Sequence, residues 1–514
     1  MNWLAQPLVR HLLLGLVAWE IVGDLDLVAG GALPSPSEIL RQAWQDRSDY
    51  GGHIIATLQA AGVGFLIGNA IAIAAALCFV RWSFSARLFQ GINVALFALP
   101  PIAVVPILLI AFDGMTPRYI LAAIAVYFPT MTAMQVGLTQ IDPRCADVVR
   151  AYGGGPFSLL WLVRLRSSLP ALLGGLRVAA PNAVLGAILA EFGGGARWGL
   201  GTYLLGSLGQ ANPARLWGIG LAATMISGLA YLVFALMARR VTGATRAVTI
   251  ASGALPQAGR GSWISMIAAI LLPFITWWLL LKLLGISPIV AKTPFGLFDY
   301  LFLAGTAESA QMRLLAALAE TLPLTLLGML VGLTFALGLA VLGEVKPALA
   351  QTLLPISLVT QTMPLVALTP LLVLLLGRGV AVTIAITVSV TFFPAFVTIA
   401  QGLQLVSRAA FDLCRAYGAS PLRELWLVAL PSALPYLFAA AKLAVPRALL
   451  GVMIAEWLAT GRGLGNLMNQ SRGFLDYGMI WAVAIVSVLI SLLFYQVIVM
   501  AEHRLQRRLG QPSA

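Results

Sequence analysis

Long apolar runs, separated by short polar stretches, make up most of the chain. A helix needs about 20 apolar residues to cross the hydrocarbon core of a membrane. We predict a spanning helix in each of twelve runs, near residues 8–30, 53–80, 88–112, 118–139, 171–192, 214–238, 263–286, 317–343, 350–376, 379–403, 435–458 and 478–500. A polar stretch with four arginines separates the first six runs from the last six. The pattern therefore predicts an all-α membrane protein with a first unit at 1–238, a linker at 239–262 and a second unit at 263–514.

The polar segments show that the two units are repeats. Residues 147–153 read Asp-Val-Val-Arg-Ala-Tyr-Gly, and residues 412–418 read Asp-Leu-Cys-Arg-Ala-Tyr-Gly, a displacement of 265 (412 − 147). Other equivalent pairs, displaced by 264 or 265, are Thr57 and Thr321, Gly64 and Gly328, Pro106 and Pro370, Phe128 and Phe393, and Glu191 and Glu456. Such self-similarity indicates a duplication. Because each unit has an even number of helices, the copies share one orientation in the membrane.

Each copy of this segment lies within a long polar stretch, at about 142–169 and 407–434. Helix-forming residues there are interrupted by Gly153 or Gly418, and a proline follows where a second helix can begin. Acidic and basic residues three positions apart, Asp147 with Arg150 and Asp412 with Arg415, can pair on one helical face. We predict a helix, a sharp bend and a second helix below the membrane. A plain solvated loop is the alternative.

Charge distribution predicts which side of the membrane these segments face. Only 10% of the 514 residues are charged, 60% are hydrophobic, and the net charge is +13. The basic residues lie between apolar runs rather than in a patch, which argues against a nucleic-acid partner. Eighteen lysines and arginines fall in segments on the side of the N-terminus and ten on the other side. The positive-inside rule therefore predicts cytoplasmic termini and cytoplasmic bends.

Candidate catalytic chemistry is sparse. The three cysteines are far apart with no CxxC spacing, and the three histidines have no nucleophile or metal-ligand spacing around them. None of the four lysines follows a glycine, so the chain has no Walker A loop for binding ATP. We expect no catalytic residue, no metal site and no bound cofactor.

The repeated segment resembles the EAA loop of ABC importer permeases. In that loop an acidic and apolar triplet precedes a glycine, and an apolar-x-Leu-Pro sequence follows. The second copy matches at Asp412, Gly418 and 428–431 (Val-Ala-Leu-Pro), whereas the first copy matches at Asp147 and Gly153 but ends in Leu165-Arg166. The sequences Leu-Pro-Ser-Pro-Ser at 33–37, Ala-Glu-Phe at 190–192, Ala-Glu-Trp at 455–457 and Gly-Leu-Gly at 199–201 and 463–465 resemble the nitrate, sulfonate and taurine branch.

This resemblance implies a type I importer (MetI-like) fold with two permease units fused in one chain, in a bacterial cytoplasmic membrane. Two copies of an ABC ATPase subunit would receive the loops, and ATP and Mg would be used by that partner. A soluble or lipid-anchored binding protein would deliver a small solute, such as a sulfonate, taurine or nitrate. The coupling residues it implies are Asp147, Arg150, Tyr152 and Gly153 in the first unit and Asp412, Arg415, Tyr417 and Gly418 in the second.

Charged residues within the predicted spans are candidates for the translocation path, because they are costly in lipid. Arg447 is the deepest, and Asn182 is its equivalent in the first unit; Arg447 either attracts an anion or pairs with Glu456 or a carbonyl. Arg177 and Lys442 lie nearer the cytoplasm, where extension to lipid headgroups is the alternative. Glu191 and Glu456 end their helices at the outer face as part of a gate or as a structural cap.

Prolines in the third run of each unit, at 100, 101, 106, 364 and 370, predict bends that let these helices line a cavity. The alternative function is a secondary transporter, which would need an acidic residue near the middle of the membrane. Only Glu20 comes close, and it lies in a peripheral first helix. A membrane scaffold is a third possibility, disfavoured by the two equivalent polar projections.

Overall fold

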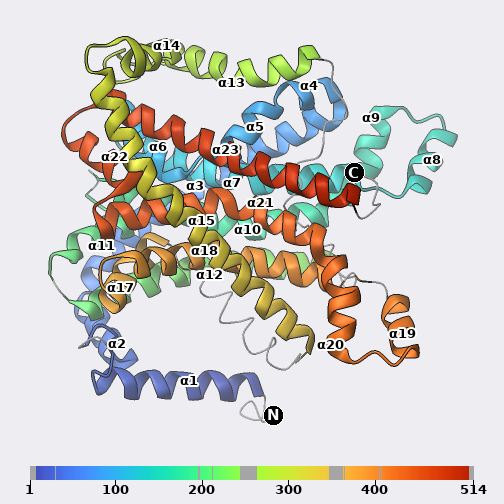
Figure 1. Ribbon diagram of the computed structural model, residues 1–514, viewed down its shortest axis with the longest axis horizontal. Coiled ribbons are helices and arrows are strands. Elements are labelled where there is room, and N and C mark those ends of the chain that lie inside the picture. The colour runs from blue at the N-terminus through green and yellow to red at the C-terminus, as the bar shows by residue number, and fades with distance from the viewer. Residues whose placement is uncertain are drawn as a thin grey trace.

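The computed structural model is a helical bundle and describes residues 7–28, 31–194, 197–210, 212–242, 263–345, 363, 365–404, 406 and 408–508, among which no strand occurs. Eight described helices are long and apolar enough to cross a membrane, and they run side by side (Figure 1). They are α3 (Arg47–Arg81), α7 (Thr116–Thr139), Pro156–Phe192 with α10 (Leu165–Phe192), α12 (Pro213–Thr242), α15 (Ala307–Val345), α18 (Val380–Gln404), Leu425–Thr460 with α21 (Leu430–Ala455), and α23 (Tyr477–Arg508). The all-α membrane fold is confirmed.

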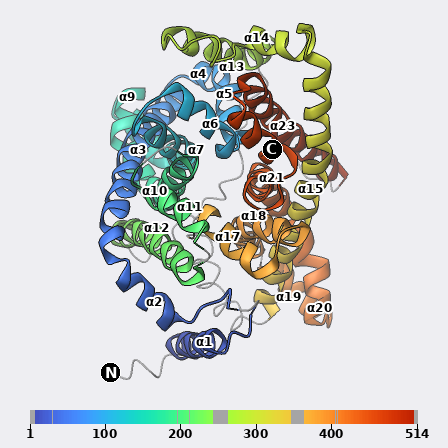
Figure 2. The same ribbon diagram turned by 90° about the vertical axis from the view of Figure 1, so that its left-hand side faces the viewer.

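The two units repeat the same packing on opposite sides of the bundle (Figure 2). In the first, α10 packs against α3, α7 and α12, and in the second α21 packs against α15, α18 and α23. Small residues permit these close contacts. A Cβ atom on Gly64 would lie 2.4 Å from the Ala122 Cβ, and one on the equivalent Gly328 would lie 2.6 Å from the Thr387 side chain.

The third run of the first unit, predicted as one helix over 88–112, is two helices. α5 (Gln90–Ala98) follows the short α4 (Ser83–Leu88), and α6 (Pro101–Ala111) turns away from α5 by 97°. Pro100 has no N–H for a helical hydrogen bond, so the helix breaks there. The predicted bend is confirmed, and it divides the run into two helices instead of one continuous helix. In the second unit α17 (Leu365–Leu376) is the described part of the equivalent run, and 350–362 and 364 lie outside the described residues.

The first run of each unit flanks the bundle instead of joining its centre (Figure 2). α1 (Pro7–Asp24) contains three charged residues, and neither it nor α13 (Trp263–Leu283) is among the eight helices that qualify as spans. α13 packs against α4 and α5 of the other unit. The predicted linker begins inside α12, and its remainder at 243–262 lies outside the described residues.

The two units are interlocked through their third runs. α6 packs against α21, α22 (Gly463–Gly473) and α23 of the second unit. In return α17 packs against α10, α11 (Leu200–Leu208) and α12 of the first. Two further short helices, α2 (Pro36–Gln45) and α14 (Pro294–Phe298) with η3 (Asp299–Leu303), lie at the end of the bundle that also holds α11 and α22 (Figure 1).

Candidate functional site

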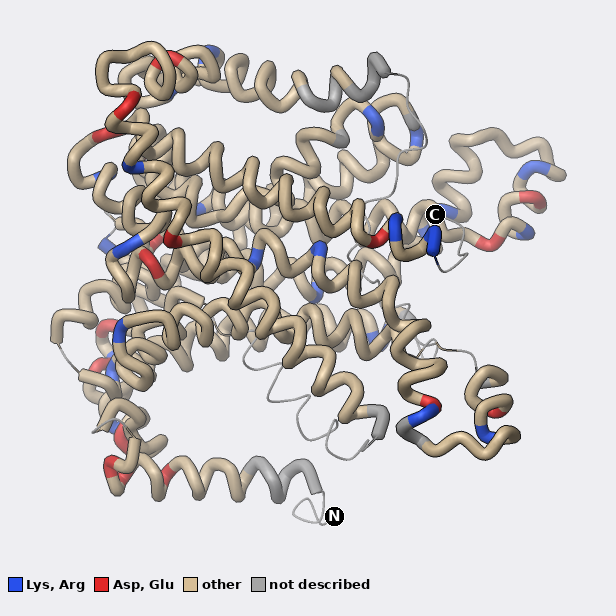
Figure 3. The backbone as a smooth tube through the Cα atoms, in the orientation of Figure 1, with Lys and Arg blue, Asp and Glu red and all other residues tan. Residues whose placement is uncertain are grey.

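Two hairpins project from one end of the bundle (Figure 1). The first consists of α8 (Pro143–Ala151) and α9 (Pro156–Leu159), and the second of α19 (Arg408–Ala416) and α20 (Pro421–Glu424). The start of α1 and the end of α23 lie at the same end, and Figure 3 shows charged residues on both hairpins. The repeated segments therefore occupy equivalent places on one side of the bundle.

The same bend closes the first arm of each hairpin. Gly153 and Gly418 have φ values of +76° and +72°, in the left-handed region that glycine adopts without a steric penalty. The residue after each glycine donates its backbone N–H to the carbonyl oxygen five residues earlier. Gly154 donates to Val149 O at 2.8 Å, and Ala419 donates to Cys414 O at 3.0 Å. These are the bonds of a Schellman helix end. The predicted glycine break is confirmed in both copies.

The second arm of each hairpin is the beginning of a spanning helix. α9 continues through a π-helical segment, η2 (Leu160–Arg164), into α10, and α20 continues through η4 (Leu425–Ala429) into α21. The uninterrupted helix Pro156–Phe192 has 37 residues, or about 55 Å at 1.5 Å per residue. A separate second helix below the membrane, as predicted, is therefore wrong. Each hairpin is rigidly continuous with the central helix of its unit.

The hairpins differ in their ion pairs. In the first, Arg150 Nη1 lies 3.2 Å from Asp147 Oδ1, as predicted. In the second, Arg415 pairs across the bend with Glu424, with Nε donating to Oε1 at 2.9 Å and Nη2 to Oε2 at 3.3 Å. This hydrogen bonding raises the pKa of Arg415. The predicted Asp412–Arg415 pair is wrong, because the bend brings in a carboxylate that the first copy lacks: its equivalent is Leu159.

Large apolar and aromatic side chains on both hairpins remain uncovered. Tyr152 is 89% exposed and Tyr417 is 85% exposed. Equivalent exposed pairs are Val148 with Leu413 and Trp161 with Trp426. Clustered exposed apolar surface marks interaction sites. The arrangement can hold a partner at two equivalent places.

At the other end of the bundle, Glu191 is fully buried at the end of α10. Its carboxylate accepts the Thr57 hydroxyl of α3 at 2.9 Å and the Gly201 N–H at 3.0 Å. The Thr57 oxygen in turn accepts the Leu200 N–H at 2.9 Å. These bonds tie the start of α11 to both long helices.

The second unit repeats this arrangement, which we name the glutamate clamp. Glu456 accepts the Thr321 hydroxyl at 2.7 Å and the Gly465 N–H at 2.9 Å, and Thr321 accepts the Leu464 N–H at 2.9 Å. A Cβ atom on Gly463 would lie 2.0 Å from the Glu456 carboxylate, and one on Gly199 would lie 2.4 Å from that of Glu191. The Gly-Leu-Gly sequences are thus required by the close approach of the carboxylate.

Two of the predicted path residues lie at equivalent positions but have different neighbours. Lys442 is buried, and its Nζ donates to Glu502 Oε2 of α23 at 2.8 Å. Arg177 lies 5.3 Å from the centroid of the Tyr231 ring of α12, and its Nε has no partner. Each side chain thus joins the central helix of its unit to the last one.

Arg447 and Asn182 lie deep in α21 and α10, and both are partly buried. Neither makes an ion pair or hydrogen bond in the part of the chain that the structure describes. The expected pairing of Arg447 with Glu456 is wrong, because the glutamate clamp occupies Glu456.

Comparison with known protein families identifies the repeat. Residues 68–247 and 328–511 each match the family described as "Binding-protein-dependent transport system inner membrane component". The chain belongs to this family. It is a transport permease of a binding-protein-dependent ABC import system, a multi-pass inner-membrane component rather than an enzyme. In such systems a separate subunit hydrolyses ATP, and a substrate-binding protein delivers the solute.

Individual relatives match this permease over one unit's length. A probable ABC transporter permease of Haemophilus influenzae is 36% identical over 33% of this chain and 69% of its own. The formylaminopyrimidine transport permease ThiX of Halalkalibacterium halodurans is 27% identical over 36% of this chain and 75% of its own. The taurine transport permease TauC of Escherichia coli is 26% identical over 42% and 80%.

Several hydrogen-bonding side chains of this permease were not predicted from the sequence. Thr57 and Thr321 are equivalent positions of the repeat, as are Glu191 and Glu456. This double recurrence could have indicated that each threonine bonds to the glutamate of its unit. His53, whose Nδ1 accepts the Gly199 N–H at 3.0 Å and whose ring stacks on Tyr203, has Ala317 as its equivalent and left no such signal.

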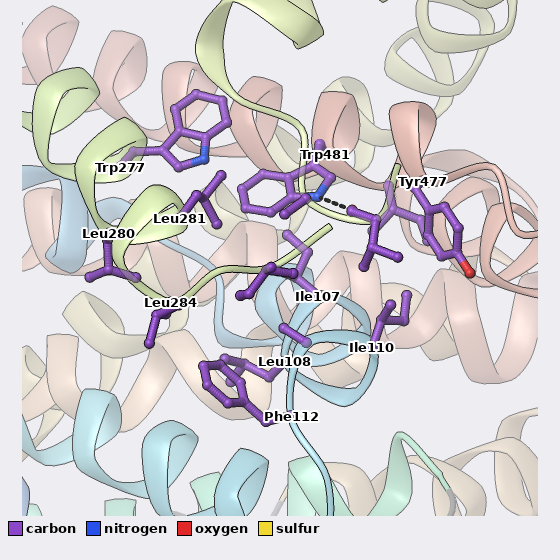
Figure 4. Close-up of a pocket in the computed structure, with 15 residues that line it drawn as sticks. Ile107, Leu108, Ile110, Phe112, Trp277, Leu280, Leu281, Leu284, Tyr477 and Trp481 are labelled. Carbon is purple, nitrogen blue, oxygen red and sulfur yellow. Dashed lines mark hydrogen bonds between the residues drawn. The ribbon is translucent and has the colours of Figure 1, made fainter. Parts of the chain in front are cut away.

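A small apolar cavity of about 120 Å³ lies where α13 meets α6 and α23 of the permease (Figure 4). Trp277 and Trp481 stack beside it with ring centroids 5.2 Å apart, and Trp481 Nε1 donates to Val290 O at 3.0 Å. The other labelled side chains are almost all aliphatic or aromatic. The cavity suits an apolar group, and Trp277 Nε1 in its lining is a buried donor with no partner among the described residues.

Proposed function

We propose that this permease imports a small anionic solute and that its two hairpins are the docking sites for two ATPase subunits. The observation that carries the proposal is the pair of exposed tyrosines, Tyr152 and Tyr417, on equivalent hairpins at one end of the bundle. The coupling set comprises Asp147, Arg150, Tyr152, Gly153, Asp412, Arg415, Tyr417 and Gly418. That end, with both termini, is the cytoplasmic end.

Rigid continuity supports this role for the hairpins. Because each hairpin runs directly into α10 or α21, movement of a docked ATPase is transmitted to the centre of the bundle. The chain itself binds no cofactor in this proposal, and the partner uses ATP and Mg. Since Arg415 is held by Glu424 and Arg150 by Asp147, two identical ATPases would meet two different surfaces.

The translocation path runs between the units, past Arg447 and Asn182. Support comes from their position on α10 and α21, the central helices, and from their lack of partners. Lys442 and the two clamp glutamates have partners and act in positioning these helices. An unpaired cation deep in a described helix favours a solute with an anionic group, and taurine, which is named for one relative's transport system, carries a sulfonate group.

Removing both tyrosine rings tests the docking sites. Tyr152→Ala with Tyr417→Ala should abolish co-purification of the ATPase and solute-stimulated ATP hydrolysis, because an exposed aromatic anchor contributes about 2 kcal/mol or more to an interface. Tyr231→Ala, a tyrosine inside α12, is the control for general loss of aromatic packing. Unchanged ATPase binding by the double variant would contradict the proposal.

A further inference from the structure

At the end of the bundle opposite the hairpins, a cavity of about 640 Å³ lies between the two units. Its walls come from the turn between α6 and α7, the loop after α10, the side of α3, and α22 of the second unit. Pockets of roughly 300 to 1,000 Å³ are typical of sites for small ligands. The size therefore suits a small molecule or one headgroup.

Three arginines line this cavity: Arg118, Arg197 and Arg472. The only acidic side chain in the lining is Asp113, which is exposed, so the formal charge of the lining is +2 (3 − 1). None of the three guanidinium groups has a carboxylate within 4.0 Å in the described chain. The lining therefore carries a net positive charge, which the nearby Glu191 carboxylate offsets in part at Arg118.

Arg118 is the deepest of the three, only 5% exposed. Its Nη1 donates to Trp198 O at 2.9 Å and contacts Met115 Sδ at 3.1 Å, which fixes the plane of the guanidinium. The other two nitrogens have no partner among the described residues, and Arg118 lines the cavity. Glu191 is close by and attracts Arg118, but it makes no ion pair within 4.0 Å, because its oxygens face the Thr57 hydroxyl and the Gly201 N–H.

Arg472 brings the second unit into the site. Its Nη1 donates to Gly193 O, at the end of α10 in the first unit, and burial lowers its pKa. Arg197 lies at the exposed mouth, 5.4 Å from the Trp198 ring centroid. Guanidinium groups held in fixed planes are suited to the oxygens of carboxylate, sulfonate or phosphate.

The arginine pair at the centre of this cavity is not repeated in the sequence of the two units. The position 264 residues after Arg118 is Val382, and the position 264 residues before Arg472 is Leu208. Arg462, an outer arginine of the second unit, has Glu320 at 4.0 Å. The two arginines therefore belong to one place among the described residues, although the clamps beside it are duplicated.

We infer that this cavity binds one oxyanion group, of the phosphate, sulfonate or carboxylate type, held by Arg118 and Arg472 and received at the mouth by Arg197. The group belongs either to a free solute or to a lipid headgroup at the outer surface. The inference concerns the end of the bundle away from the hairpins, so it does not depend on ATPase docking.

The test uses the purified full-length permease in phosphatidylcholine nanodiscs, without the ATPase. Binding of inorganic phosphate and of methanesulfonate is measured by calorimetry, and retention of phosphatidylglycerol by native mass spectrometry. We expect at least one of these ligands to bind. Arg118→Gln with Arg472→Gln should weaken it by about 10-fold or more, because each removes a charge-assisted hydrogen bond.

Two further variants separate binding from folding. Arg197→Gln, at an exposed position, should weaken binding several-fold without changing the melting temperature, and Arg462→Gln should leave binding within about twofold. Binding of the free anions identifies a solute site, and retention of phosphatidylglycerol alone identifies a headgroup site. If wild type binds none of these ligands, or if Arg197→Gln and the double variant both bind as wild type does, the inference is overturned.

Discussion

At the scale of single residues, the buried carboxylates are explained by their donors. Glu191 and Glu456 end the central helices at the end away from the hairpins, where an unpaired carboxylate would be costly. Each instead receives a hydroxyl and a backbone N–H, and the same hydroxyl accepts a second N–H. A gate residue would need to release these partners, so the geometry favours a fixed clamp.

Replacing Glu191 by Gln keeps the shape, but with the amide oxygen on the Gly201 N–H the new NH2 donor faces the Thr57 hydroxyl, whose oxygen already accepts the Leu200 N–H. We expect a loss of about 1 to 3 kcal/mol in unfolding free energy. Thermal unfolding in detergent measures the loss, and Glu456→Gln should behave alike. Glu308→Gln, at an exposed position of α15, is the matched control. Melting temperatures equal to wild type in both clamp variants would contradict the clamp.

Unlike the two clamp glutamates, Arg447 makes no hydrogen bond or ion pair with the described residues. Arg447→Gln should raise the apparent KM for an anionic solute by about 10-fold, since a hydrogen bond to a charged group contributes about 1.5 to 3 kcal/mol. Uptake into proteoliposomes measures the change, and Asn182→Ala is the comparison at the equivalent position. An unchanged KM for Arg447→Gln would remove this residue from the path.

At the scale of elements, the two hairpins have the same backbone geometry at the bend but differ in their side-chain ion pairs. The helix end at Gly153 and that at Gly418 use the same backbone hydrogen bonds, although the residues after them differ. The ion pairs beside the bends do not repeat, because Glu424 has a leucine as its equivalent. Backbone conformation, rather than the salt bridge, is therefore what the two hairpins share.

Gly153→Ala isolates this backbone requirement, because no atom lies within 4 Å of the added Cβ. A left-handed conformation costs a non-glycine residue about 1 to 2 kcal/mol. Amide hydrogen exchange in α8 should therefore accelerate about 5- to 30-fold. Gly155→Ala is the matched control, since its φ is −82° and its Cβ also meets nothing. Equal exchange in both variants would show that the bend is not held by this glycine.

At the scale of the whole molecule, the two units cannot separate without exposing core. α6 lies against helices of the second unit and α17 against helices of the first. At the end away from the hairpins, Phe192 and Trp457 meet edge to face, with centroids 6.3 Å apart. Fusion into one chain also permits asymmetry: Arg447 has Asn182 as its equivalent, His53 has Ala317, and Arg118 has Val382.

This interlocking predicts that neither unit is stable alone. Residues 1–242 and 263–514 expressed separately should each be degraded or aggregate, since the faces of α6 and α17 that pack on the other unit would be left bare. Co-expression should restore a complex that co-purifies. Size-exclusion chromatography of each fragment provides the measurement. A monodisperse, folded single unit would contradict the interlock.

Local chemistry in the sequence determined the helices, the duplication and the glycine bends, because hydrophobic run length and the freedom of glycine act over a few neighbouring residues. It also indicated the break at Pro100. The contacts of the polar groups depended on the tertiary structure. Thr57 and Glu191 are 134 residues apart, Lys442 and Glu502 are 60 apart, and Arg415 reaches Glu424 only because the chain turns back. Such partners are set by the packing of distant helices, which no local pattern encodes.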